Sequence, residues 1–209
     1  LCGVIALFIA TPDSWQLHHM APIRQDLLRR RVYQLKAELA ELNIPLVMVE
    51  GSDYQQVSEV FRQLADSGMR HLFAQTEYEL RELQRDQAVT ALLDAKGIKS
   101  SWFDYQCLIP PGQIRNQQGD IYKVFTPFKK RWLQQFAEQG AACLPRLAMP
   151  EMPVLTLPVF SRMKPGDGSS ADWPVAEQQV LQRLRQFCQQ RVADYRALRD
   201  LPAIDGTSC

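Results

Sequence analysis

Hydrophobic positions follow two different spacings over the first hundred residues. Short continuous apolar runs are typical of strands that are buried on both faces. Such runs lie at Val4–Ala10, Leu46–Val49, His71–Ala74 and Ser101–Phe103. Between them, apolar residues recur every three or four positions, which predicts amphipathic helices. The expected helices run from Pro22 to Asn43, from Val57 to Gly68 and from Leu80 to Gly97.

Strand and helix therefore alternate, with short turns between them. This order predicts an α/β fold, a parallel sheet with helices on both faces. Ligands of such sheets bind beyond the carboxyl ends of the strands. Those ends are the segments after Ala10, Glu50, Ala74 and Phe103.

The second half of the chain has a different pattern. Thr126 and Pro127 predict the N-cap and first residue of a short helix, which Gly140 closes. The stretch from Leu144 to Pro174 is rich in proline and glycine, as in a connector. From Val175 to Arg199, apolar residues line one face of a last helix, and one helix cannot bury such a face alone. We predict an α/β domain at 1–106, a connector at 107–174 and the start of a helical domain at 175–209.

The amino-acid composition limits the kinds of protein that this chain can be. The 209 residues are 46% hydrophobic and 22% charged, as in globular proteins. The 24 Lys and Arg nearly balance the 23 Asp and Glu, so only a local patch could attract nucleic acid. The longest apolar run is too short to span a bilayer, and we expect no membrane contact. Five scattered cysteines and three histidines predict neither a disulfide framework nor a metal site, and we expect a cytoplasmic protein.

No self-sufficient catalytic motif is present in the sequence. A glycine-rich dinucleotide loop is missing after the first strand, where Thr11-Pro12-Asp13 stands instead. The sequence also contains no Walker A, G-x-S-x-G or H-E-x-x-H motif. Periodicity alone therefore leads no further than an α/β domain with a connector.

Three longer strings are more specific. The first is Ile9–Pro12, which is followed by Trp15, His18, Met20 and Pro22. The second is Tyr122–Lys129, which reads YKVFTPFK and precedes Trp132. The third is Tyr195–Ser208, which reads YRALRDLPAIDGTS. In this order they resemble segments of the class I cyclobutane pyrimidine dimer photolyases, within the photolyase/cryptochrome family. The resemblance spans essentially the whole chain and fits the amino-terminal, antenna-domain portion of such a protein.

The resemblance implies a DNA-repair enzyme with deoxyribodipyrimidine photo-lyase activity and two chromophores. An antenna pigment, a reduced folate such as 5,10-methenyltetrahydrofolate or a deazaflavin, binds the Rossmann-like domain and passes excitation to reduced FAD. The FAD lies in a helical domain and splits a dimer flipped out of UV-damaged DNA. We expect one strand upstream of Leu1 and most of the flavin site downstream of Cys209. The 209-residue chain alone is then inactive, and the intact protein is a monomer without protein partners.

Site residues follow from the same resemblance. His18 stands where folate-type members have a histidine beside the antenna pigment. Glu82 matches a glutamate that contacts the pterin, and Arg81 occupies the position of a neighbouring asparagine. Tyr195 matches a tyrosine that contacts FAD, and Thr207 and Ser208 match the start of the loop that holds the FAD phosphates. Arg199 matches an arginine that faces DNA. No catalytic residue and no metal ligand falls within the chain.

Two other functions stay open at this point. A cryptochrome-type blue-light photoreceptor would share the fold and the chromophores but would signal instead of repairing DNA. A generic nucleotide- or flavin-binding α/β module would have no role in light. The residues that separate repair from signalling lie in the dimer pocket, which we expect beyond Cys209.

Overall fold

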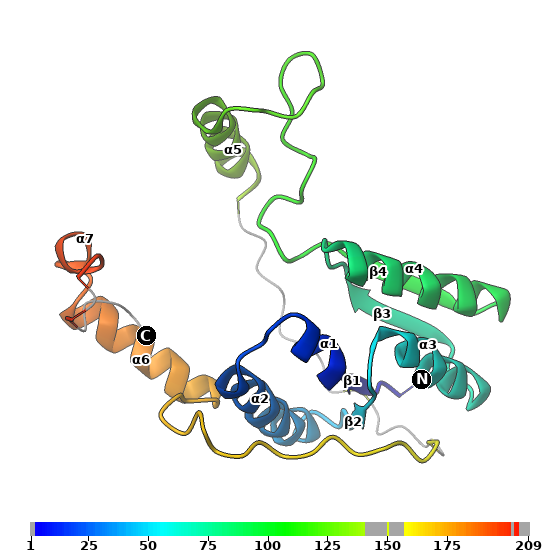
Figure 1. Cartoon of the computed structure of the whole chain (residues 1–209). Coiled ribbons are helices and arrows are strands. Elements are labelled where there is room, and N and C mark those ends of the chain that lie inside the picture. Colours follow the sequence, from blue (N-terminus) through cyan, green and yellow to red (C-terminus); the bar gives the residue numbers. More distant parts are fainter. Residues whose placement is uncertain (1–2, 141–149, 151–156, 202, 205–209) are drawn as a thin grey trace. The chain divides into compact units, whose positions relative to one another are not determined.

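A computed structural model describes residues 3–140, 150, 157–201 and 203–204 (Figure 1). The strands are β1 (Ala6–Ala10), β2 (Leu46–Glu50), β3 (His71–Gln75) and β4 (Lys99–Phe103). The helices are α1 (Pro12–Leu17), α2 (Pro22–Ala40), α3 (Tyr54–Asp66), α4 (Leu80–Ala95), α5 (Phe125–Gln139), α6 (Glu177–Gln190) and α7 (Tyr195–Leu198). None of these described helices is both long and apolar enough to cross a bilayer.

The predicted strands and their parallel pairing are confirmed. β1 pairs with β2 and β3 pairs with β4, so the strands form two two-stranded parallel sheets rather than one. Contacts group the chain into two compact units, 1–52 with 149–154 and 160–209, and 53–148 with 155–159. Each unit contains one of the sheets. The domain boundaries at 106 and 174 stay predictions.

The first unit has its core between α2 and the β1–β2 sheet. Ala10, Trp15, Val32, Leu46 and Met163 are buried there. Leu28, Leu35 and Leu39 pack against this cluster from α2, as their spacing predicts. Met163 belongs to the returning chain, the segment at 160–175 that rejoins the first unit after α5. This segment also forms a β-bridge between Arg162 and Val49 of β2.

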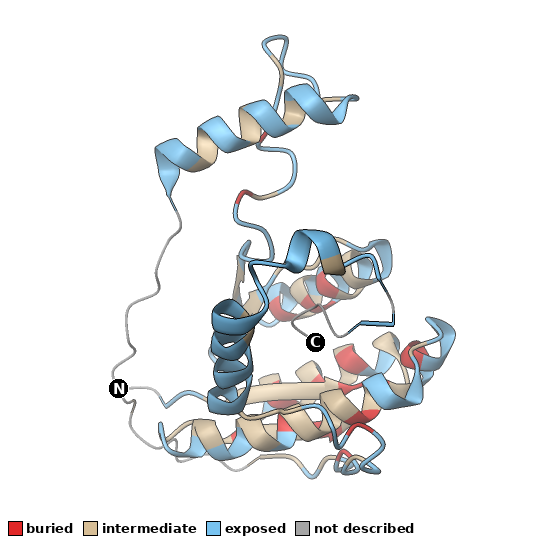
Figure 2. Cartoon of the chain, turned by 90° about the vertical axis from the view of Figure 1, so that its left-hand side faces the viewer, coloured by how far each residue is buried: buried red, intermediate tan, exposed pale blue. Residues whose placement is uncertain are grey.

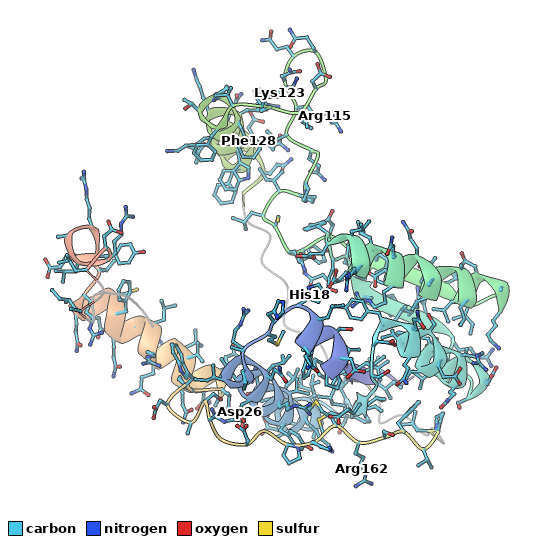
Figure 3. All side chains as sticks on the ribbon, in the orientation of Figure 1. His18, Asp26, Arg115, Lys123, Phe128 and Arg162 are labelled. Atoms are coloured by element: carbon cyan, nitrogen blue, oxygen red, sulfur yellow. The ribbon has the colours of Figure 1, made fainter. Side chains whose placement is uncertain are left out.

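Asp26 on α2 binds the returning chain through hydrogen bonds (Figure 3). Its side chain is only 2% exposed and accepts the backbone N–H groups of Gly168 at 2.9 Å and Ser170 at 2.8 Å. The Ser170 hydroxyl donates to the same carboxylate, and Arg30 donates to the Ser170 hydroxyl oxygen at 2.8 Å. A Cβ at Gly166 would overlap the Asp26 carboxylate, so this approach requires glycine. The connector is therefore held by hydrogen bonds to a buried charge.

A second set of contacts holds the connector nearby. Arg29 donates to Glu50 at 2.7 Å and to the backbone carbonyl of Lys164 at 2.9 Å, and its guanidinium lies 5.2 Å from the centre of the Trp15 ring. The Tyr33 hydroxyl donates to the carbonyl of Met163 at 2.9 Å. One face of α2 thus packs on the sheet while its polar residues bind the returning chain.

The second unit packs α3 and α4 together beside the β3–β4 sheet. Val57, Val60, Leu64, Val89 and Leu93 are its buried apolar helix residues. Figure 2 shows buried residues of the chain in red along its helices. The Trp102 indole N–H on β4 donates to the Thr90 hydroxyl on α4 at 3.1 Å, which links sheet and helix.

The predicted ends of α3 and α4 are confirmed. Gly68 and Gly97 follow the helices with φ of +97° and +67°, the left-handed backbone that favours glycine. The Gly68 N–H donates to the Ala65 carbonyl at 3.2 Å, and the Met69 N–H donates to the Leu64 carbonyl at 3.1 Å. These are the two bonds of a Schellman motif.

Three local predictions are wrong. Pro12 begins a short helix, α1, where the sequence predicted only a boundary. The N-cap of α5 is Val124 instead of Thr126, since proline also fits the first turn, whose N–H groups lack partners within the helix. The predicted last helix ends at Gln190, and a turn separates it from α7.

Two apolar residues that the three-to-four spacing includes are exposed. Leu80 is 70% exposed in the first turn of α4, and Leu42 is 38% exposed beyond the end of α2. The apolar face of α6 is also open among the described residues, with Val180, Leu181 and Leu184 between 39% and 50% exposed. This agrees with the expectation that one helix cannot bury that face alone.

Asp26→Asn should destabilise the first unit. The Ser170 hydroxyl, and then the backbone N–H groups, lower the pKa of Asp26 to about 2 from its ordinary 3.8. Because this pKa is depressed, the contribution of Asp26 to stability is fully present above pH 3.8 and is lost as the pH falls toward 2. Thermal unfolding should show a lower midpoint for the variant at neutral pH, and the gap should close over that acid range.

Asp167→Asn is the matched control. Asp167 accepts the N–H of Ser169 at 2.9 Å in an exposed turn, so its loss should leave the unfolding midpoint near that of the wild type. Equal midpoints for the two variants at neutral pH would contradict the role given to Asp26.

Candidate functional site

Polar side chains gather where β3 and β4 end. Glu77 and Tyr78 follow β3, and Asp104 follows β4. The Thr76 N–H donates to the Phe103 carbonyl at 2.8 Å, which keeps the two strand ends together. The first turns of α3 and α4 contribute further polar groups to this end of the sheet. The sequence predicted ligand binding at such an edge.

Arg85 is the centre of this network. It donates to Glu77 and to Asp86, with N–O distances of 2.7 and 2.8 Å. Its guanidinium also lies 5.1 Å from the centre of the Tyr54 ring, within the range of a cation–π contact. One planar cation thus connects the loop after β3, the start of α3 and the body of α4.

Tyr54 and Glu82 link the two helices by a hydrogen bond. The Tyr54 hydroxyl donates to Glu82 Oε1 at 2.6 Å, and both side chains are half-buried. Burial and this hydrogen bond raise the pKa of Tyr54, so the phenol stays protonated and donates. Glu82 is therefore an oriented carboxylate rather than a solvated surface charge.

Asp86 is the most buried acid of the network. It is 8% exposed, and burial raises the pKa of its carboxyl although the hydrogen bond from Arg85 opposes that change. Its Oδ2 is enclosed and has no hydrogen-bond partner among the described residues. Removal of Arg85 would therefore leave a buried acid without its cation.

A hollow of about 540 Å³ lies elsewhere in the same unit, between the loop at 107–122 and α5. Its walls include Ile109, Pro110, Tyr122, Phe128 (Figure 3) and Trp132, and no charged side chain lines it. Specific ligand sites need a few convergent polar groups in addition to apolar walls. The polar network at the strand ends is therefore the stronger candidate.

The predicted antenna residues fall in both units. Arg81 and Glu82 are neighbours in the first turn of α4, where Arg81 is exposed. His18 is exposed at the carboxyl end of α1, in the other unit, and its backbone N–H donates to the Ser14 carbonyl at 3.0 Å. The structure brings the first two residues together, and the role of all three stays a prediction.

The predicted flavin and DNA residues lie at the end of the chain. Tyr195 begins α7, is 39% exposed and packs edge-to-face on Phe187 with ring centres 5.8 Å apart. Arg199 is exposed, lies 3.5 Å from a carboxylate oxygen of Asp200 and sits 5.9 Å from the Tyr195 ring centre. Thr207 and Ser208 lie outside the described residues.

Sequence reasoning missed most of the network around Glu82. Tyr54, Glu77, Arg85 and Asp86 were not singled out. A usable signal was available, because Tyr54 and Glu77 lie shortly after strands β2 and β3, at the ends where ligands bind.

The network presents an oriented carboxylate next to an exposed arginine. A carboxylate held at fixed rotation accepts N–H donors from a flat heterocycle, and a nearby arginine can meet an anionic substituent. Glu82 and Arg81 supply these two groups within a single helical turn. The donor set thus fits an aminopyrimidine-type ligand.

Comparison with known proteins identifies the class. A family model described as DNA photolyase matches residues 3–151, and the chain belongs to the DNA photolyase family. Among characterised relatives, the deoxyribodipyrimidine photo-lyase of Vibrio cholerae is 40% identical over 210 residues. That match covers 98% of this chain and 45% of the relative, so the chain spans less than half of the relative's length.

Two solved structures share the fold. A class III photolyase from Agrobacterium tumefaciens matches with a TM-score of 0.65 and 22% identity, over 99% of this chain and 43% of that one. A cryptochrome from Synechocystis matches with a TM-score of 0.69 and 18% identity, over 95% and 43%. The α/β fold predicted from the sequence is thus the fold of these proteins.

Arg85→Gln tests the network. The change leaves Glu77 and Asp86 without their shared cation, so the free energy of unfolding should fall by about 1–3 kcal/mol. Arg81→Gln, an exposed change one turn earlier, should alter it by no more than about 0.5 kcal/mol. Urea denaturation measures both, and equal stabilities would show that the Arg85 ion pairs contribute nothing.

Proposed function

We propose that the protein repairs cyclobutane pyrimidine dimers in DNA with light, and that this chain supplies its antenna domain. The observation that carries the proposal is 40% identity, over 98% of the chain, to a protein named deoxyribodipyrimidine photo-lyase. That match extends over nearly the whole chain. The substrate is then UV-damaged DNA, as the name of the relative implies.

Proteins of this family generally hold FAD and an antenna chromophore. We assign the antenna pigment to the carboxyl end of β3 and β4, with Glu82 and Arg81 as its contacts. His18, in the other unit, is proposed as an antenna residue from the family resemblance alone. When bound, such a pigment absorbs light and passes the excitation to FAD. A reduced folate fits this donor set better than a deazaflavin, because its aminopyrimidine edge offers N–H donors to the Glu82 carboxylate.

The flavin and the DNA belong to the other end of the chain. We assign Tyr195, Thr207 and Ser208 to FAD, and Arg199 to a DNA phosphate. The exposed Tyr195 ring and the exposed Arg199 guanidinium support these roles, since both are accessible to a ligand. The proposed parts are an antenna domain at 1–106, a connector at 107–174 and the start of a flavin domain at 175–209.

We place the intact protein in the cytoplasm, as a monomer. Cys107 and Cys188 are free and exposed, which suits a reducing compartment.

Titration of the 209-residue chain with 5,10-methenyltetrahydrofolate tests the antenna site. We expect saturable binding, seen as a change in pigment absorbance, and weaker binding of a deazaflavin. Glu82→Gln should weaken folate binding by about tenfold or more, because a hydrogen bond to a charged group is replaced by one to a neutral group.

Glu79→Gln provides the control for that titration. Glu79 is exposed at the N-cap of the same helix and should not affect the affinity. If the wild-type chain bound no folate, or if both variants bound like the wild type, the assignment of the pigment to Glu82 would fail.

A blue-light assay on the product of the complete gene tests the repair activity. We expect loss of thymine dimers from irradiated DNA in the light and none in the dark. A protein that holds FAD but leaves the dimers intact would be a cryptochrome-type photoreceptor. A colourless protein without flavin that still binds adenosine nucleotides would be a generic nucleotide-binding module.

A further inference from the structure

Tyr54 is fixed before any ligand arrives. It is the first residue of α3, and the Asp53 side chain caps that helix by accepting the N–H groups of Gln55 at 3.0 Å and Gln56 at 3.2 Å. The cap gives partners to two N–H groups that the first turn would otherwise leave unsatisfied, which stabilises the backbone that carries Tyr54.

The Tyr54 ring is held as well. Arg85 lies over it at 5.1 Å, and Arg85 is itself tied to Glu77 and Asp86. A guanidinium with two carboxylate partners cannot move away without breaking both ion pairs, of which the one to Asp86 is largely shielded from water. The ring therefore keeps its hydroxyl on the Glu82 carboxylate, at 2.6 Å.

This contact has a direct consequence for Glu82. A glutamate side chain in the first turn of a helix has three rotatable bonds, and ordering it during binding costs affinity. The Tyr54 hydroxyl occupies one carboxylate oxygen, Oε1, and thereby sets the rotation of the whole group. The plane in which the carboxylate accepts further N–H donors is then defined in advance.

We propose that Tyr54 is a positioning residue that holds the Glu82 carboxylate in one orientation for a flat heterocycle with an N–H donor edge. The inference rests on the proposed antenna site and adds to it the residue that orients its carboxylate. Such a ligand presents neighbouring ring and amino N–H groups, as an aminopyrimidine does. A ring that offers only acceptors gains less from the fixed carboxylate.

A double-mutant cycle with folate as the probe tests the inference. Tyr54→Phe in the 209-residue chain should weaken binding of 5,10-methenyltetrahydrofolate by about tenfold, the effect of losing a hydrogen bond to a charged group. In a Glu82→Gln background the same change should alter the affinity by less than about twofold, because the group that Tyr54 orients is no longer a carboxylate. A merely structural role would weaken binding by the same factor in both backgrounds.

Tyr33→Phe is the matched control. It removes a phenol hydrogen bond to the carbonyl of Met163, in the other unit, and should leave the affinity unchanged. A second readout needs no pigment: the carboxyl ¹³C resonance of Glu82, identified by its absence in Glu82→Gln, should shift in Tyr54→Phe.

Failure of the positioning role and failure of the antenna site give different results. If Glu82→Gln weakens binding but Tyr54→Phe binds like the wild type, or if the carboxyl resonance does not move, the positioning role is wrong and the antenna site stands. If Glu82→Gln binds like the wild type, Glu82 is not a contact of the pigment, and the assigned site fails together with the inference.

Discussion

Parallel pairing of β3 with β4 is the constraint on which the candidate site depends. Because both strands run the same way, the loops that leave them emerge at one edge, and the helix that follows β3 begins there too. Glu77, Asp104 and Glu82 are brought to this edge from three separate stretches of sequence. Antiparallel pairing would have divided these groups between opposite ends of the sheet.

Arg85 makes that collection of charges stable. The carboxylates of Glu77, Glu82 and Asp86 lie close together and would repel one another or change protonation if no cation lay among them. The guanidinium is planar and carries five donors, so it can bind Glu77 and Asp86 while its face covers the Tyr54 ring. Lysine has the same charge but could not make all three contacts at once.

Much of the fold could be predicted from the sequence, because short apolar runs and a three-to-four spacing are local signals. Gly68 and Gly97 marked helix ends for the same reason. The six-residue helix α1 is too short to show a period, and the break after Gln190 falls within an unbroken apolar stripe. Sequence reasoning also had no means to find which strands pair, since pairing joins residues far apart in the chain.

The site was predicted only where the resemblance supplied a residue. Glu82 and Arg81 were named through it, and the structure gives Glu82 an oriented carboxylate. Tyr54 and Arg85 act through contacts between α3 and α4, and neither spacing nor composition records such contacts. A charged residue on an amphipathic helix looks the same in the sequence whether it faces water or a neighbouring phenol.

The placement of Arg29 has an optical consequence. Its guanidinium covers the Trp15 ring and also donates to the backbone of the returning connector at Lys164. A cation close to an indole alters the energy of its excited state, so the emission of Trp15 depends on where Arg29 sits. Attachment of the connector is thus coupled to the fluorescence of one buried tryptophan, and the protein carries its own reporter of that docking.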